Sequence, residues 1–160
     1  KEGYTIVQSF EYVLVMILAQ LPGYIAAAWL VEKLGRKATL AGFIGMCAVS
    51  AYFFGQSNSV EQIVIWGCLM SFFNLGAWGV LYTYTPEQYP TNIRAFGSGW
   101  ASAIGRMGGI VAPLVVTHMM VMNNGFSYVF MMFTAVLLAV ACVILVLGEE
   151  TKGKSLDSIS

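Results

Sequence analysis

Long apolar runs separated by short polar segments dominate the hydropathy pattern of this chain. A helix needs about 20 residues to cross the hydrocarbon core of a bilayer, and five runs are long enough to do so. They cover residues 9–31, 38–55, 63–84, 95–122 and 126–148. The runs are continuous rather than alternating, and they are longer than the strands of a membrane barrel. The pattern therefore predicts an all-α membrane protein with five transmembrane helices.

The composition agrees with a membrane location. The chain is 58% hydrophobic and 10% charged, with a mean hydropathy of +0.74, whereas a soluble domain has about 25% charged residues. Its net charge is zero, so the lipid bilayer is the expected partner and nucleic acid is not. The three cysteines, Cys47, Cys68 and Cys142, lie in apolar runs without metal-ligand spacing, and we expect them to pack as small hydrophobic side chains. No pattern predicts a metal site, a cofactor or an enzyme.

The basic residues predict the orientation of the helices. Among the connections and the tail, basic residues occur in the loop of residues 32–37, in the loop of residues 86–94 and in the tail of residues 149–160. The connections around residues 56–62 and 123–125 contain no Lys or Arg. With five spans the three basic segments fall on one side of the membrane, which the positive-inside rule assigns to the cytoplasm. We therefore expect a cytoplasmic carboxyl terminus.

Three polar segments carry a family resemblance. The first loop reads Glu32-Lys33-Leu34-Gly35-Arg36-Lys37, with Ala28 four positions before Glu32. Gly35 permits a tight reversal between two helices. The loop resembles the signature Gly-x-x-x-Asp-Arg/Lys-x-Gly-Arg-Arg/Lys of the major facilitator superfamily, with Ala28 and Glu32 replacing the first two motif residues. Residues 86–94 resemble the loop between helices ten and eleven of its sugar-porter and organic-ion branch, and residues 149–153 resemble its Pro-Glu-Thr-Lys-Gly tail.

The resemblance covers the whole chain and implies helices eight to twelve of a carboxyl-terminal six-helix bundle. We expect helix seven and the amino-terminal half of the same carrier as partners. The resemblance also implies that the loops stabilise one state of a rocking motion. The residues implied in this conformational gating are Glu32, Lys33, Gly35, Arg36, Lys37, Glu87 and Arg94.

Within that branch, residues 8–13, 18–23, 71–81 and 84–91 resemble bacterial niacin transporters. This implies uptake of nicotinate or nicotinamide, coupled to protons as symport, by a multi-pass protein of the bacterial inner (plasma) membrane. A carrier of another organic anion, a sugar or an aromatic acid is an alternative. A non-transporting membrane receptor or scaffold on a carrier fold is another.

Arg106 is the candidate for cargo contact. It lies in the run of residues 95–122, which has no acidic residue, and a charge at that depth costs about 2.5–3.5 kcal/mol on insertion scales. Its guanidinium therefore needs a carboxylate on another helix, a water-filled cavity or an anionic ligand. At helical spacing Ser98 and Ser102 share its face, and Ala101, Gly105 and Gly109 form a neighbouring ridge suited to helix contact. The alternative is a buried ion pair with Glu11 or with an acid outside this chain.

The resemblance also bears on the charge of the expected cargo. In organic-cation carriers of the branch the position of Arg106 is typically an aspartate, and that of Gln20 is a glutamate. Both differences remove negative charge from the expected cavity, so the resemblance implies a small organic anion as cargo.

Other side chains complete the expected substrate site. Asn74 and Trp78, on one face with Ser71 and Tyr82, offer hydrogen bonding and stacking to a pyridine ring. An aromatic helix–helix contact is the alternative, and we expect it for Phe72 and Phe73. Gln20 and Tyr24 share a face beside Pro22-Gly23, which loosens or kinks the helix. Glu11 is either a proton carrier or an ordinary interfacial residue, and Gly42 and Gly45 are expected at close helix contacts.

Overall fold

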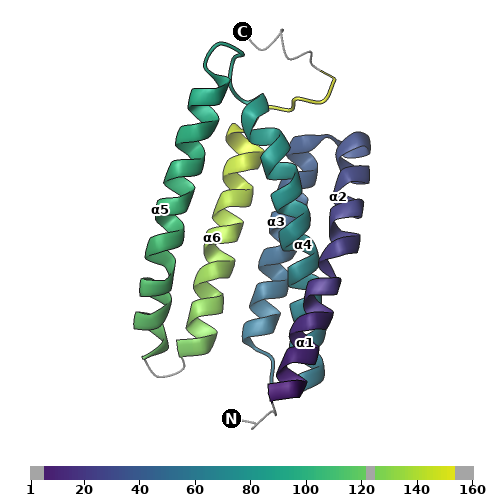
Figure 1. Ribbon diagram of the computed structural model, residues 1–160, viewed down its shortest axis with the longest axis vertical. Helices are drawn as coiled ribbons and strands as arrows, with labels where there is room; N and C mark the ends of the chain where they lie inside the picture. Colours follow the sequence, from purple (N-terminus) through teal and green to yellow (C-terminus); the bar gives the residue numbers. More distant parts are fainter. Residues whose placement is uncertain (1–5, 122–124, 154–160) are drawn as a thin grey trace.

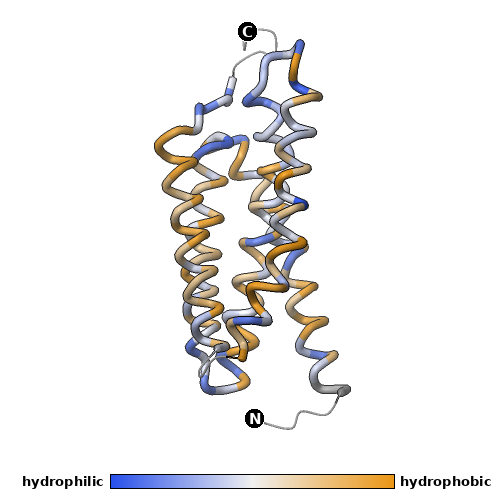
Figure 2. Tube along the Cα trace, turned by 90° about the vertical axis from the view of Figure 1, so that its left-hand side faces the viewer, coloured by the Kyte–Doolittle hydropathy of each residue, from blue (hydrophilic) through white to orange (hydrophobic). Residues whose placement is uncertain are grey.

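The computed structural model describes residues 6–121 and 125–153, and every regular element in these two ranges is a helix. The helices are α1 (Ile6–Leu18), α2 (Gln20–Leu34), α3 (Arg36–Gly55), α4 (Val60–Glu87), α5 (Arg94–Met120) and α6 (Gly125–Leu147). They run roughly side by side along the long axis of the molecule (Figure 1). Apolar residues dominate the middle of the helices, and hydrophilic residues gather towards both ends (Figure 2).

Five stretches of the described chain are long and apolar enough to cross a membrane. They are Ser9–Leu34, Arg36–Gly55, Val60–Glu87, Arg94–Met120 and Gly125–Leu147. Because α1 and α2 together form the first stretch, six helices make five spans. The predicted all-α membrane bundle is confirmed.

The division between α1 and α2 follows from a proline. Ala19 keeps a nearly helical backbone (φ −63°, ψ −16°), and its N–H still bonds to the carbonyl oxygen of Val15 at 3.0 Å. Pro22 has no N–H to give the carbonyl of Leu18, and its ring crowds that carbonyl. The interruption therefore lies about one turn before Pro22-Gly23 rather than at this pair.

The core forms around α3, which packs between α4 and α6, while α2 packs against α4. Phe43 of α3 stacks on Phe72 with ring centroids 6.2 Å apart and meets Phe73 edge-on at 5.5 Å. The expectation that these two phenylalanines form a helix–helix contact is confirmed. In contrast α5, whose neighbours are α4 and α6, has no buried residue.

Glycines bring the backbones of α2 and α4 close together. A Cβ atom on Gly23 would overlap the carbonyl oxygen of Phe72, and one on Gly76 would overlap the Phe43 ring and lie 3.0 Å from the carbonyl oxygen of Gly23. Small residues permit such contacts between membrane helices. The expectation for Gly42 and Gly45 is wrong within the described chain, because an added Cβ atom there meets no heavy atom within 4 Å.

Replacing Gly23 by alanine tests this contact. We expect Gly23→Ala to destabilise the protein by about 1–3 kcal/mol, because the carbonyl of Phe72 has to move away from the new methyl group. Gly42→Ala is the matched control, and we expect it to be neutral or stabilising by about 0.5–1 kcal/mol through helix propensity. Thermal unfolding of the purified variants in detergent measures both effects. Equal unfolding temperatures for the two variants would contradict the contact.

Candidate functional site

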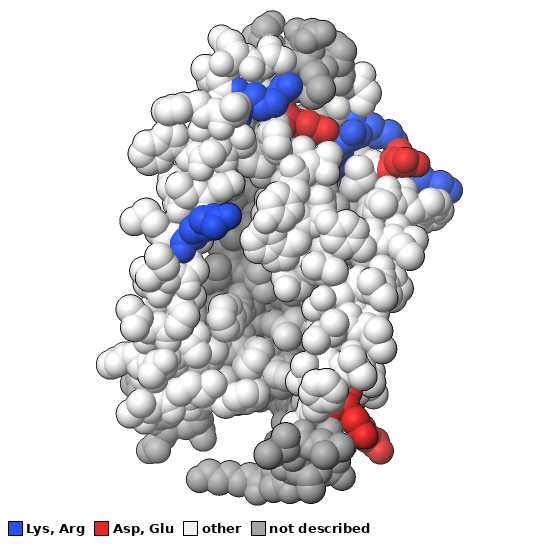
Figure 3. Space-filling view, viewed as in Figure 1, with Lys and Arg blue, Asp and Glu red and all other residues white. Residues whose placement is uncertain are grey.

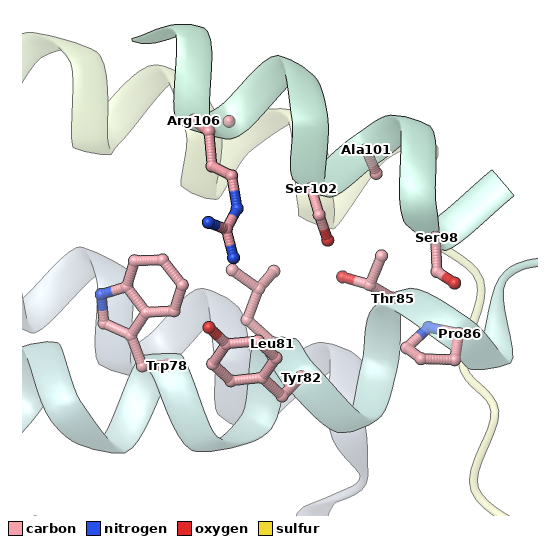
Figure 4. A pocket seen from close by; sticks show the side chains of 10 residues that line it. Trp78, Leu81, Tyr82, Thr85, Pro86, Ser98, Ala101, Ser102 and Arg106 are labelled. Atoms are coloured by element: carbon pink, nitrogen blue, oxygen red, sulfur yellow. The ribbon is translucent and has the colours of Figure 1, made fainter. Parts of the chain in front are cut away.

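A cleft of about 400 Å³ separates α4 from α5, within the usual size range of small-molecule sites, about 300–1,000 Å³. We call it the α4–α5 cleft. From α4 it is lined by Trp78, Leu81, Tyr82, Thr85 and Pro86, and from α5 by Ser98, Ala101, Ser102, Gly105 and Arg106 (Figure 4). The small residues of α5 leave this space open, because Ala101 and Gly105 present almost no side chain to α4. Within the described chain the ridge that contains them therefore borders a cleft rather than a tight helix contact.

Arg106 extends from α5 into this cleft, towards α4 (Figure 4). Within residues 6–121 and 125–153 no carboxylate lies within 4.0 Å of its guanidinium, since the one ion pair found there joins Arg36 to Glu87. The ion pair between Arg106 and Glu11 is therefore not formed. Among the described residues, the guanidinium faces an open cleft.

Two aromatic rings form the wall opposite Arg106. The ring centroids of Trp78 and Tyr82 lie 5.5 Å apart with an angle of 36° between the planes, and the two side chains are 47% and 69% exposed. Because each ring retains an accessible face, the wall can stack against a flat aromatic molecule.

The cleft brings together three of the six residues expected to bind substrate: Arg106, Trp78 and Ser102. The other three lie elsewhere. Tyr24 contacts α4 at Gly79 and lines a separate groove of about 150 Å³ between α2 and α4. Gln20 is half-buried at the start of α2, and Asn74 is exposed on α4 without lining the cleft. Glu11, the expected proton carrier, is exposed on α1.

Thr85 and Pro86 also line the cleft, and neither is among the residues expected from the sequence to bind substrate. The signal for Thr85 was present in the face of Ser71, Asn74, Trp78 and Tyr82. One further step of three residues along that face reaches Thr85.

A second polar group lies at one end of the bundle, where Figure 3 shows acidic and basic side chains side by side. We call Arg36, Glu87, Glu150, Thr151 and Lys152 the end cluster. Arg36 Nε lies 3.3 Å from Glu87 Oε2, and the buried hydroxyl of Thr151 donates to the same oxygen. The cluster thus joins the start of α3, the end of α4 and the tail.

Glu150 caps α3 from a distant part of the sequence. Gly35, which precedes the helix, has a φ of 95° that favours glycine, and it offers no side-chain cap. The carboxylate of Glu150 instead accepts the backbone N–H groups of Arg36 at 2.9 Å and Lys37 at 3.2 Å. The first N–H groups of a helix lack intrahelical partners, and a carboxylate there makes strong charge-assisted hydrogen bonds.

Further hydrogen bonds hold the tail and the α4–α5 loop in place. The Lys152 ammonium donates to the carbonyl oxygen of Lys33 at 2.6 Å, and the Tyr84 hydroxyl donates to the carbonyl oxygen of Glu149 at 2.8 Å. Arg94 Nε donates to the carbonyl oxygen of Pro86 at 3.0 Å. Of the expected gating residues, Gly35, Arg36, Lys37, Glu87 and Arg94 lie in or beside the end cluster. Glu32 and Lys33 have exposed side chains, with the Lys33 ammonium 4.2 Å from the centre of the Trp29 ring.

Comparison with known proteins assigns the chain to a family. Residues 7–159 match the family model of the Major Facilitator Superfamily. The chain belongs to this superfamily. As a major-facilitator chain with five described spans it is a multi-pass membrane protein.

Three relatives place it within the superfamily. It is 79% identical to "Niacin transporter NiaP" of Acinetobacter baylyi, over 99% of this chain and 36% of that protein. It is 57% identical to "Putative niacin/nicotinamide transporter NiaP" of Bacillus subtilis, over 98% of this chain and 39% of that protein. It is 32% identical to "Organic cation/carnitine transporter 7" of Arabidopsis thaliana, over 95% of this chain and 30% of that protein. The chain thus spans little more than a third of the first two relatives, and the expected likeness to niacin transporters within the superfamily is confirmed.

Removing the Glu150 carboxylate tests the capping of α3 in this major-facilitator bundle. We expect Glu150→Ala to cost about 1–3 kcal/mol of stability, because two helix N–H groups lose their acceptor and remain partly buried. Glu32→Ala, which removes an exposed carboxylate at the same end, is the matched control and should change stability by less than about 0.5 kcal/mol. Thermal unfolding in detergent compares the two, and an equal loss in both variants would contradict the capping role.

Proposed function

We propose that this chain forms part of a secondary active transporter that takes up a small aromatic carboxylate, with nicotinate as the first candidate. The observation that carries the proposal is the placement of Arg106 opposite Trp78 and Tyr82 in the α4–α5 cleft. A positive group and a stacking surface face each other across a space of ligand size. An aromatic acid carries the two complementary features, a carboxylate and a flat ring.

The charge of the cleft supports an anion rather than a cation. Arg106 is the one ionisable lysine, arginine, aspartate or glutamate among the described lining residues. The planar fork of a guanidinium matches the two oxygens of a carboxylate. A cationic cargo would meet repulsion here without a carboxylate to offset it. The names of the two most similar relatives reported above support nicotinate or nicotinamide among the possible cargoes.

Binding near the middle of α5 fits alternating access, in which two halves of a carrier move around a central site. In this proposal the end cluster stabilises one state, because the ends of α3 and α4 cannot separate while Arg36 pairs with Glu87. The clustering of the basic segments at one end supports a cytoplasmic carboxyl terminus in a bacterial inner membrane. We further propose proton symport, with Glu11 as the candidate proton carrier and the remaining partners supplied by helix seven and the amino-terminal half.

Substitutions of Arg106 that remove its charge or its fork-shaped donor group test the proposal. We expect Arg106→Gln to lower kcat/KM for nicotinate uptake by about 10- to 100-fold, because the carboxylate loses a charge-assisted hydrogen bond worth about 1.5–3 kcal/mol. Uptake of nicotinamide, which has no carboxylate, should fall far less. Arg106→Lys keeps the charge without the fork and should give an intermediate loss for nicotinate.

The measurement is uptake of the labelled compounds by the full carrier in proteoliposomes, with membrane insertion measured for every variant. Met107→Leu is the control, since Met107 is exposed on α5 and lies outside the described cleft lining. Normal nicotinate uptake by a correctly inserted Arg106→Gln protein would exclude the cargo contact. Nicotinate binding without any flux in the unmodified carrier would instead favour a receptor.

A further inference from the structure

Several serine and threonine hydroxyl groups of α4 and α5 donate to a backbone carbonyl of their own helix. The Ser98 hydroxyl donates to the carbonyl oxygen of Arg94 at 2.6 Å, and that of Thr83 donates to Gly79 at 3.3 Å. Thr117, farther along α5, donates to Pro113 at 2.8 Å. Such bonds to the residue four positions earlier are common for serine and threonine in helices. These three hydroxyl protons are therefore not available to a ligand.

Ser102 and Thr85 differ from them. Neither hydroxyl makes a hydrogen bond to any residue within 6–121 or 125–153, and both side chains line the α4–α5 cleft. In Figure 4 both hydroxyl groups are directed into the gap between the helices, on the same side of the Arg106 guanidinium. They come from opposite walls, Ser102 from α5 and Thr85 from α4. The cleft thus holds two free hydroxyl donors beside its positive group.

The spacing of these groups suits one small molecule. Ser102 lies one helical turn from Arg106, a rise of about 6 Å along the axis. Tyr82 also lines the cleft here, whereas Trp78 lies on the other side of the guanidinium from Ser102 and Thr85 (Figure 4). A ligand whose carboxylate reaches Arg106 therefore places the far edge of a six-membered ring near Ser102 and Thr85.

We propose that Ser102 and Thr85 form a subsite that donates a hydrogen bond to the ring nitrogen of a pyridine carboxylate. This inference rests on the proposed function, in which Arg106 holds the carboxylate. At neutral pH a pyridine nitrogen is unprotonated and accepts a hydrogen bond, and a serine or threonine hydroxyl can donate one. The subsite selects a pyridine acid such as nicotinate over benzoate, which has the same charge and nearly the same shape but no ring nitrogen.

The energetic basis of this selection is the unpaired donor. When benzoate fills the cleft it excludes water from Ser102 and Thr85 and gives them no acceptor in return. A site built to hydrogen-bond its substrate discriminates strongly against an analogue that lacks the group, because its own polar groups are left unsatisfied. Stacking and the pairing with Arg106 are the same for both acids and give no discrimination.

Competition between the two acids tests the subsite. The full carrier is reconstituted in proteoliposomes, and the concentrations of unlabelled nicotinate and benzoate that halve uptake of labelled nicotinate are measured. We expect the unmodified carrier to prefer nicotinate by tenfold or more. Thr85→Val and Ser102→Ala should each raise the nicotinate concentration that halves uptake by about three- to tenfold. The double variant should raise it by about tenfold or more. Benzoate should not weaken in these variants, and it should compete better where the donor that it leaves unpaired is removed.

Three control variants separate the hydroxyl from its surroundings. Thr83→Val and Thr117→Val remove hydroxyl groups that are bonded to their own helices, and both should keep the preference of the unmodified carrier. Thr85→Ser retains a hydroxyl donor at this position and should also keep the preference for nicotinate. Each variant is accepted only at normal membrane insertion.

The possible results are distinct. A double variant that keeps the preference for nicotinate would overturn the subsite while leaving the Arg106 proposal intact. Equal weakening of nicotinate and benzoate would overturn it too, because the hydroxyl groups would then act without regard to the ring nitrogen. An unmodified carrier that transports none of these acids would overturn the proposed function and the subsite together.

Discussion

A charge in the hydrocarbon of a bilayer needs a polar partner, and this constraint governs where the charged side chains of the described chain lie. Most of the described charges stand near the helix ends, where Glu87 and Glu150 bind the start of α3. Arg106 stands in the middle of α5, where the chain leaves a cleft rather than a carboxylate. Glu87 and Glu150 thus have partners within the described chain, whereas the guanidinium of Arg106 faces an open cleft and needs a polar partner from elsewhere.

The end cluster shows how a few hydrogen bonds can hold distant segments together. Arg36 and Glu150 are 114 positions apart in the sequence, yet the tail carboxylate closes the first turn of α3. Glu87 pairs with the Arg36 guanidinium and accepts a hydrogen bond from Thr151, so α4 is held to the same point. Separation of α3 from α4 at this end would require the loss of these contacts together, and the transport proposal therefore assigns the cluster to one of two states.

Hydropathy and charge were sufficient for the architecture. The five apolar runs, the all-helical fold and the residues Arg106, Trp78 and Ser102 of the cleft follow from length, period and the cost of a buried charge. Asn74, Gln20 and Tyr24 were not brought to the cleft, because helical period shows which residues share a face but not which neighbour that face meets. Tyr24 faces α4 from α2, whereas the cleft lies between α4 and α5.

The same limit applies to glycines and caps. Gly23 and Gly42 are equivalent in a sequence, and only the packing of α2 against α4 makes the first a close contact. Glu150 was visible as part of the tail motif, but its role as the cap of α3 depends on a contact between residues far apart in the chain. Local patterns predict elements, and long-range contacts decide what each side chain does in them.

The cleft and the end cluster are continuous along α4. Thr85 and Pro86 line the cleft, and the next residue, Glu87, pairs with Arg36. Arg94 binds the carbonyl of Pro86 and so connects the start of α5 to the same turn. In the proposed transport cycle, a molecule bound in the cleft would contact Thr85 and Pro86, next to Glu87, and the α5 wall of the cleft has no buried residue. A ligand shifts an equilibrium by its different affinity for the two states. Because this turn of α4 carries both sets of contacts, the transport proposal couples cargo binding to the opening of the end cluster through it.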